Sequence, residues 1–145
     1  MMAAADKFEI TVHGRGTHGA APSLGTDPVV VAAHIVTALQ SLISREKDPV
    51  AAGVVSVGSI HAGKAYNVIP DTARLGGTIR AVDDSVFDAL RKGVVRVARK
   101  TAEAFGAKAS VKLGHAQYPP LHNDVHAVNY ARRALGEPFM ELQHP

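Results

Sequence analysis

The chain has 145 residues, of which 46% are hydrophobic and 20% charged, with a formal net charge of +3 and no cysteine. This length and balance fit one globular domain, and the absence of cysteine excludes disulfides, thiolate metal sites and a cysteine nucleophile. No apolar run reaches the roughly 20 residues that span a bilayer, and residues 1–6 do not resemble a signal peptide. We therefore expect a cytoplasmic protein with no membrane partner.

The first predicted elements are a strand and a glycine-rich loop. Apolar and polar residues alternate over residues 7–13, which predicts a half-buried strand. The loop that follows, residues 14–22, reads Gly-Arg-Gly-Thr-His-Gly-Ala-Ala-Pro. Glycines allow positive φ and close approach of the backbone to a ligand, and a histidine changes charge near neutral pH. The loop is predicted to be flexible and to present His18 to a ligand.

The first predicted helix covers residues 28–44. Asp27 is a candidate N-cap, and Pro28 suits the first helical position. Two apolar stripes lie side by side on this helix, and only a few polar side chains interrupt them. A helix that is apolar on more than one face is buried on more than one face. Either it lies wholly inside its own fold, or one side covers a sheet and another side meets a partner.

The remaining elements complete a β-α-β-β-α-β order. Strands are predicted at residues 50–61, 72–81 and 109–113, and a second helix runs from Asp83 to Gly106. The Gly76-Gly77 pair predicts a bulge or a close backbone approach. This order is the split, ferredoxin-like α+β fold, with a four-stranded antiparallel sheet and two helices on one face.

The domain boundaries follow from composition. We assign residues 1–6 to a leader and residues 7–118 to the domain. Residues 119–145, after Tyr118 and two prolines, are predicted to start another unit, with a short helix capped by Asp124 and closed by Gly136.

Three other site types fit the sequence poorly. Gly14-x-Gly16-x-x-Gly19 matches the dinucleotide fingerprint, but no helix opens directly after it. His122 and His126 have helical spacing, but Pro119-Pro120 predicts that the helix begins after His122, which argues against a metal site. A basic cluster on the second helix, which we interpret as a solvated face rather than a nucleic-acid surface, comprises Arg91, Lys92, Arg96, Arg99 and Lys100.

Three motifs in order resemble one enzyme family. They are the histidine loop at 14–22, Ala-Gly-Lys-Ala-Tyr-Asn-Val-Ile-Pro-Asp at 62–71, and Gly-Gly-Thr-Ile-Arg at 76–80. Together they resemble the aminoacylase, carboxypeptidase G and hippurate hydrolase family (metallopeptidase family twenty), in its N-acyl-amino-acid amidohydrolase branch. The resemblance covers about residues 8–121. It implies the inserted lid, or dimerisation, domain rather than the catalytic domain.

The resemblance also implies roles for single residues. His18 matches the histidine that reaches the partner subunit's active site and stabilises the oxyanion there. Asn67 and Arg80 match positions that hold the carboxylate of an N-acyl amino acid. Two divalent metals, zinc, manganese or cobalt, are implied for the absent catalytic domain and none for this chain. The implied homodimer uses the helix at 28–44 and the edge strand at 54–60.

One alternative from another class stays open at this stage. The same element order is shared by stand-alone ferredoxin-like binding or regulatory modules, which need no catalytic domain. An RNA-recognition module is disfavoured because no predicted strand carries the paired aromatic residues that stack bases.

Overall fold

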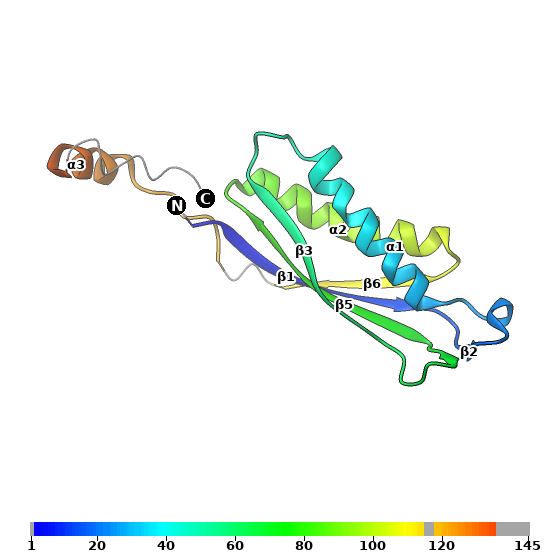
Figure 1. The fold of residues 1–145 in the computed structure, drawn as a ribbon. Helices are drawn as coiled ribbons and strands as arrows, with labels where there is room; N and C mark the ends of the chain where they lie inside the picture. Colours follow the sequence, from blue (N-terminus) through cyan, green and yellow to red (C-terminus); the bar gives the residue numbers. More distant parts are fainter. Residues whose placement is uncertain (1, 115–117, 136–145) are drawn as a thin grey trace.

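The domain has two layers, a four-stranded antiparallel sheet and two helices that cover one of its faces (Figure 1). A computed structural model describes residues 2–114 and 118–135. The sheet has the order β3-β5-β1-β6, with all neighbours antiparallel. The elements are β1 (Ala4–His13), α1 (Pro28–Ser41), β3 (Gly53–Ala62), β5 (Thr72–Ala81), α2 (Asp84–Ala104) and β6 (Lys108–Leu113). The predicted ferredoxin-like α+β fold is confirmed.

Shorter elements extend these layers. A two-stranded ribbon joins β2 (Thr17–His18) to β4 (Val68–Ile69) at one end of the sheet. A 3₁₀ turn, η1, covers Pro22–Leu24, and a π-helical turn, η2 (Leu42–Glu46), directly follows α1. The helix α3 (Val125–Leu135) lies apart from the two layers in Figure 1 and buries no side chain.

The first strand begins earlier than its sequence pattern indicates. Ala4 pairs with Ala81 of β5, and both side chains are buried in the core. Asp6 is also buried, where it meets Arg91 of α2. Residues 4–6, which sequence analysis assigned to a leader, therefore belong to the sheet. Ala-Ala-Asp gives no apolar alternation, and the packing that holds these residues comes from β5 and α2.

Capping fixes the start of α1 where it was predicted. The Asp27 carboxylate accepts hydrogen bonds from the backbone N–H groups of Val29 (2.8 Å) and Val30 (3.4 Å), and Pro28 occupies the first turn. The α-helical part ends at Ser41, three residues before the predicted end. The π-helical turn η2 then carries the chain on to Glu46.

The helical segment Pro28–Glu46 is long enough and apolar enough, with a mean hydropathy of 1.3, to cross a bilayer by length and composition alone. Sequence analysis found no such run. Core helices of soluble proteins pass the same test, and here Val31, Ile35 and Leu39 are fully packed between the helix and the sheet. Core packing therefore accounts for much of the hydropathy of this segment.

The core lies between the sheet and the helices, and alternate strand residues point into it. Its largest fully buried side chains include Phe8, Ile10, Ile35, Leu39, Leu75 and Ile79. Helical periodicity from Phe87 through Leu90, Val94 and Val97 predicts that Phe105 also belongs to the core stripe of the second helix, and that prediction is wrong. Phe105 is 43% exposed and stacks on the His34 ring of α1, with ring centroids 4.4 Å apart. No helix formed by the described residues covers the other face of the sheet (Figure 1).

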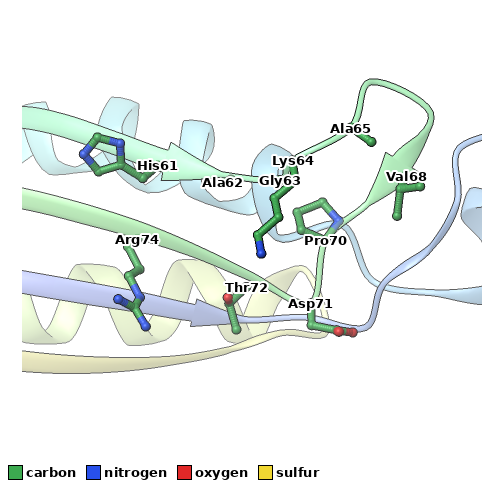
Figure 2. A pocket seen from close by; sticks show the side chains of 10 residues that line it. All are labelled: His61, Ala62, Gly63, Lys64, Ala65, Val68, Pro70, Asp71, Thr72 and Arg74. Carbon is green, nitrogen blue, oxygen red and sulfur yellow. The ribbon is translucent and has the colours of Figure 1, made fainter.

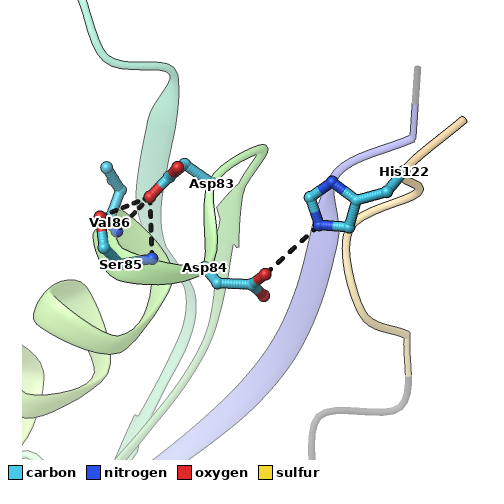
Figure 3. Close-up of polar contacts among 5 residues, drawn as sticks. All are labelled: Asp83, Asp84, Ser85, Val86 and His122. Atoms are coloured by element: carbon cyan, nitrogen blue, oxygen red, sulfur yellow. Dashed lines mark hydrogen bonds and ion pairs between the residues drawn. The ribbon is translucent and has the colours of Figure 1, made fainter. Parts of the chain in front are cut away.

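Polar contacts at the start of α2 join the cap to the later chain (Figure 3). Asp83 accepts hydrogen bonds from the backbone N–H groups of Ser85 (2.8 Å) and Val86 (3.1 Å). His122 Nε2 lies 3.3 Å from a carboxylate oxygen of Asp84. His122 thus precedes α3 and contacts α2, so it does not share a helix face with His126. Asp124 caps α3 as predicted, whereas Gly136 lies outside the described residues.

Candidate functional site

The glycine-rich loop is anchored to the segment before β5. Asp71 accepts two hydrogen bonds of 2.8 Å from the loop, one at its backbone carbonyl from Gly14 and one at its carboxylate from Gly16. Gly19 donates to the Asn67 carbonyl, also at 2.8 Å. The loop was predicted to be flexible. These contacts instead hold it in one conformation, and a fixed loop positions a side chain more accurately than a mobile one.

The loop glycines are needed for close packing. A Cβ atom at Gly14 would lie 2.3 Å from the Thr26 carbonyl oxygen, and one at Gly16 would lie 2.6 Å from that of Ile69. Among the described residues, positive φ occurs only at Gly63 and Gly106. Of the two explanations that the sequence offered for these glycines, close backbone approach is the one that applies.

His18 is exposed on the β2–β4 ribbon, opposite Val68. Its Nδ1 accepts a hydrogen bond from the backbone N–H of Ala20 at 3.1 Å. In a neutral imidazole only one nitrogen carries a proton, so an accepting Nδ1 places that proton on Nε2. The ring therefore presents an Nε2–H donor to solvent, which is the state required to stabilise a developing negative charge.

Asn67 lies beside His18, and Arg80 does not. The Asn67 carbonyl is bonded to Gly19, the residue after His18, so the two residues share one end of the domain. Arg80 lies near the other end of β5, exposed, between its pairing partners Ala5 and Val54. At about 3.3 Å per residue, the strand from Thr72 to Arg80 separates Arg80 from the ribbon by roughly 26 Å.

A hollow of about 500 Å³ opens beside the ribbon, where the end of β3 meets the start of β5 (Figure 2). Its lining includes three basic side chains, those of His61, Lys64 and Arg74. Gly63, with φ of +67°, makes the turn that brings Lys64 back over this space. Sequence analysis singled out none of these three side chains. Lys64 lies in the motif at 62–71, but that motif does not indicate that Lys64, His61 and Arg74 meet.

The outer side of α1 and the neighbouring edge strand β3 form an uncharged surface, which we call the α1–β3 flank (residues 28–44 and 53–62). These two stretches contain no aspartate, glutamate, lysine or arginine. Val29, Val30, Val54 and Ile60 each remain about half exposed. Exposed apolar side chains grouped on one side of a domain are typical of a surface that meets a partner.

No metal centre can be assembled from the residues described. In residues 2–114 and 118–135, no three His, Asp or Glu side chains converge in a way that would hold an ion. Metal ligation by this part of the chain therefore enters no step below.

Comparison with known proteins identifies relatives of this domain. The N-acetyl-L-cysteine deacetylase of Bacillus subtilis is 35% identical over 145 residues, which is all of this chain and 35% of that protein. The hippurate hydrolase of Campylobacter jejuni is 35% identical over 141 residues, or 97% of this chain and 37% of that protein. The chain thus spans about a third of the length of the curated relatives that it matches.

A solved structure shares the fold closely. The Bacillus subtilis YXEP protein, described as a dinuclear metal binding peptidase of the M20 family, superposes with a TM-score of 0.72 at 31% identity. That match covers 92% of this chain and 32% of the solved one. The pattern of the peptidase dimerisation domain matches residues 4–105, which includes the residues before Lys7 that form the start of β1. The chain therefore belongs to the peptidase dimerisation domain family of the M20 peptidases.

Proposed function

We propose that this chain is the dimerisation and lid domain of a metal-dependent amidohydrolase that cleaves the amide bond of N-acyl amino acids. Its relatives include enzymes named for such substrates, an N-acetyl-L-cysteine deacetylase and a hippurate hydrolase. In this proposal a separate catalytic domain of a cytoplasmic parent protein holds two divalent metals. The name of the YXEP protein, a dinuclear metal binding peptidase, supports that part of the proposal.

The observation that supports this function best is the fixed orientation of His18. Its Nδ1 is occupied by the Ala20 N–H, so Nε2–H is the free donor. When a nucleophile attacks an amide carbonyl, negative charge develops on the oxygen, and one preorganised donor aimed at it contributes about 3 kcal/mol. His18 performs this role in the active site of the partner subunit.

The positions of Asn67 and Arg80 indicate how two subunits share a site. Both are proposed to contact the substrate carboxylate, and Arg suits this role because its planar fork binds carboxylates bidentately. Within one chain they lie at opposite ends of the sheet. A two-fold axis that pairs edge strands antiparallel brings opposite ends of two sheets toward one another. Each site then combines His18 and Asn67 of one subunit with Arg80 of the other.

The α1–β3 flank is the surface proposed to pair the subunits, through the helix at 28–44 and the edge strand at 54–60. Among residues 2–114 and 118–135, no strand pairs with the outer edge of β3, because β3 is the first strand in the sheet order, and its backbone groups there can pair with another strand. The strand is irregular between Val57 and Ser59, where its register with β5 shifts. This bulge divides β3 into two regular stretches, and strand pairing is limited to them.

The role of His18 is tested in the complete protein that contains this domain. Replacing His18 with Ala removes the side-chain donor but keeps the loop, since Gly14, Gly16 and Gly19 make the anchoring contacts. We expect kcat for an N-acyl amino acid to fall by about a hundredfold with little change in KM, because the contact forms in the transition state.

The matched control replaces His13 with Ala. His13 is also exposed, but it lies on β1 and contacts Ser110 of β6 instead of the ribbon. Its replacement is expected to leave kcat unchanged. Equal activity of the His18 variant and the unmodified enzyme would contradict the oxyanion role.

A further inference from the structure

Basic side chains line the hollow beside the ribbon, and two of them have no acidic partner in the described part of the chain. Within residues 2–114 and 118–135, neither Lys64 nor Arg74 has a carboxylate at ion-pair distance. Asp71 is the one acidic residue among the lining residues, and its carboxylate is bonded to the Gly16 N–H at 2.8 Å. In Figure 2 that carboxylate turns away from Lys64. Positive charge therefore exceeds negative charge in this hollow, which favours an anionic occupant.

The side chains around the hollow can bind one carboxylate from several directions. Lys64 extends from the turn after β3 toward the start of β5, and Arg74 extends from β5 with its guanidinium directed away from Lys64 (Figure 2). His61 approaches from the end of β3, where it is paired with Arg74 across the two strands. Arginine offers a planar fork to a carboxylate and lysine a mobile point charge, so the two complement one another around a single anion.

The hollow also adjoins the residue that the proposed function places at the reaction. Val68 lines the hollow, and Val68 is paired with His18 across the ribbon. Side chains of directly paired residues lie on the same face of a two-stranded ribbon, with their Cβ atoms about 5 Å apart. A ligand whose reacting carbonyl approaches His18 therefore lies beside the end of the hollow that Val68 lines.

We propose that this hollow binds a second anionic group of the substrate, so that the parent enzyme favours N-acyl amino acids that carry two carboxylates. The inference rests on the proposed function for its substrate class, because the reacting amide is assigned to His18. Arg80 and Asn67 are assigned to the α-carboxylate. His61, Lys64 and Arg74 receive the additional carboxylate, which comes from an acidic side chain or a dicarboxylic acyl group.

A neighbouring hollow on the open face of the sheet does not offer the same chemistry. It measures about 330 Å³ and shares His61 and Arg74 with the first. Glu9 and Lys112 lie opposite one another there, on paired positions of β1 and β6. The formal charges of the two hollows sum to the same value, but here Glu9 faces Lys112 directly, whereas the Asp71 carboxylate of the first hollow is bonded to the Gly16 N–H. We therefore assign the anion to the hollow that contains Lys64.

The test compares two ligands that differ in one group. The isotopically labelled chain is titrated with N-acetyl-L-glutamate, which has two carboxylates, and with N-acetyl-L-glutamine, in which the side-chain carboxylate is an amide. We expect N-acetyl-L-glutamate to bind roughly three- to tenfold more tightly, the range for one or two solvent-exposed charge contacts. The shifted backbone amide signals are expected at residues 61–64 and 72–74.

Three variants test which side chains cause the preference for the ligand with two carboxylates. Lys64→Gln and Arg74→Gln are each expected to reduce the preference to less than twofold. Lys108→Gln removes a lysine of β6 that does not line the hollow, and it is expected to keep the full preference. Equal affinity for the two ligands, binding of neither, or a preference that survives both substitutions would overturn the proposal. This readout needs neither turnover nor metal, so it is independent of the His18 experiment.

Discussion

The two edge strands of the sheet, β3 and β6, differ in whether they carry charged side chains. β3 at one edge is ten residues long and contains no lysine, arginine, aspartate or glutamate. β6 at the other edge is six residues long and contains Lys108 and Lys112. Lysine on an edge strand discourages another strand from pairing with it, because pairing would bring its charge into an interface. One edge is thus protected by charge and the other is open to a partner.

The helices repeat the same difference. The outer face of α2 carries the basic cluster, whereas α1 has no formally charged residue. Within the cluster, Arg96 pairs with Glu46, Lys100 with Glu103 and Arg91 with Asp6. Carboxylates therefore already neutralise three members of the cluster, which favours a solvated helix face over a nucleic-acid surface. Charged residues therefore make ion pairs within the fold on the side of α2, whereas the α1–β3 flank has no formally charged residues.

The largest expected effect on stability is on the side of the domain formed by α2 and β6, which we call the charged flank. The Arg91 Nε lies 2.9 Å from an Asp6 carboxylate oxygen without the alignment of a hydrogen bond, so the contact is an ion pair. The Asp6 side chain is 1% exposed and that of Arg91 28%. Arg91→Ala leaves a buried carboxylate without its counter-charge, which is expected to reduce the free energy of unfolding by about 3 kcal/mol. Urea denaturation at fixed protein concentration measures the loss.

Arg99→Ala is the control for Arg91→Ala, because Arg99 lies exposed on the same helix. It is expected to change stability by less than about 0.5 kcal/mol. Sedimentation of the Arg91 variant is expected to show unchanged self-association. Equal stabilities of the two variants would show that the buried pair does not stabilise the fold.

A charge placed on the other flank is expected to act on association instead. We expect the unmodified chain to sediment as a dimer at micromolar concentration. Ile60→Lys introduces a cation on the uncharged edge strand, and two-fold symmetry places it on both subunits. Because burying or juxtaposing like charges costs several kcal/mol, the dimer dissociation constant is expected to rise roughly a hundredfold.

Ser110→Lys adds the same charge to β6 and is expected to leave the dimer intact. Ile60 is about half exposed, and the alkyl part of a lysine can cover the same surface, so the fold is expected to be retained. A monomeric unmodified chain, or equal dimer affinities for the two variants, would rule out the α1–β3 flank as the interface.

Local sequence patterns predicted most of this fold. The alternation of β1 and the carboxylate caps at Asp27 and Asp83 involve residues close together in the chain, so their effects can be inferred without the tertiary structure. The start of β1 was missed because Asp6 is stabilised by Arg91, a partner far along the chain. Phe105 was misplaced because helical periodicity places a residue on a helix face without showing where the neighbouring helix ends.

The candidate site was less predictable than the fold. The motifs at 14–22 and 62–71 identified His18 and Asn67, and the structure places these two residues together. The position of Arg80, near the opposite end of the domain, follows from the register of β5 with its neighbours. A sequence motif does not contain that register. The basic hollow could not be found in sequence because His61, Lys64 and Arg74 gather around the hollow only when β3 and β5 pair.

The smallest expected effect comes from one charge at the start of α2. A hydrogen bond from the Ser85 hydroxyl, and then those from the Val86 and Ser85 N–H groups, hold the pKa of Asp83 below its ordinary value of 3.8. A carboxyl with a lowered pKa in the folded state adds stability above its unfolded pKa and loses it as pH falls through the folded pKa. Asp83→Asn retains an oxygen acceptor and removes only the charge, so its melting temperature is expected to lie slightly below that of the unmodified chain from neutral pH down to about 5.

That difference should shrink as the pH falls below 3.8 and disappear once the pH lies below the lowered pKa of Asp83 in the folded state, since Asp83 is then protonated in both states. The exchange of Asp84 for Asn is the matched control, because Asp84 contacts His122 and does not cap the helix. Its effect on the melting temperature is expected to be small, because both partners of the Asp84–His122 pair are exposed. A melting difference for Asp83→Asn that is the same at pH 3 and pH 7 would show that the amide weakens the cap for geometric reasons. The charge at this helix start would then contribute nothing to the stability of the charged flank.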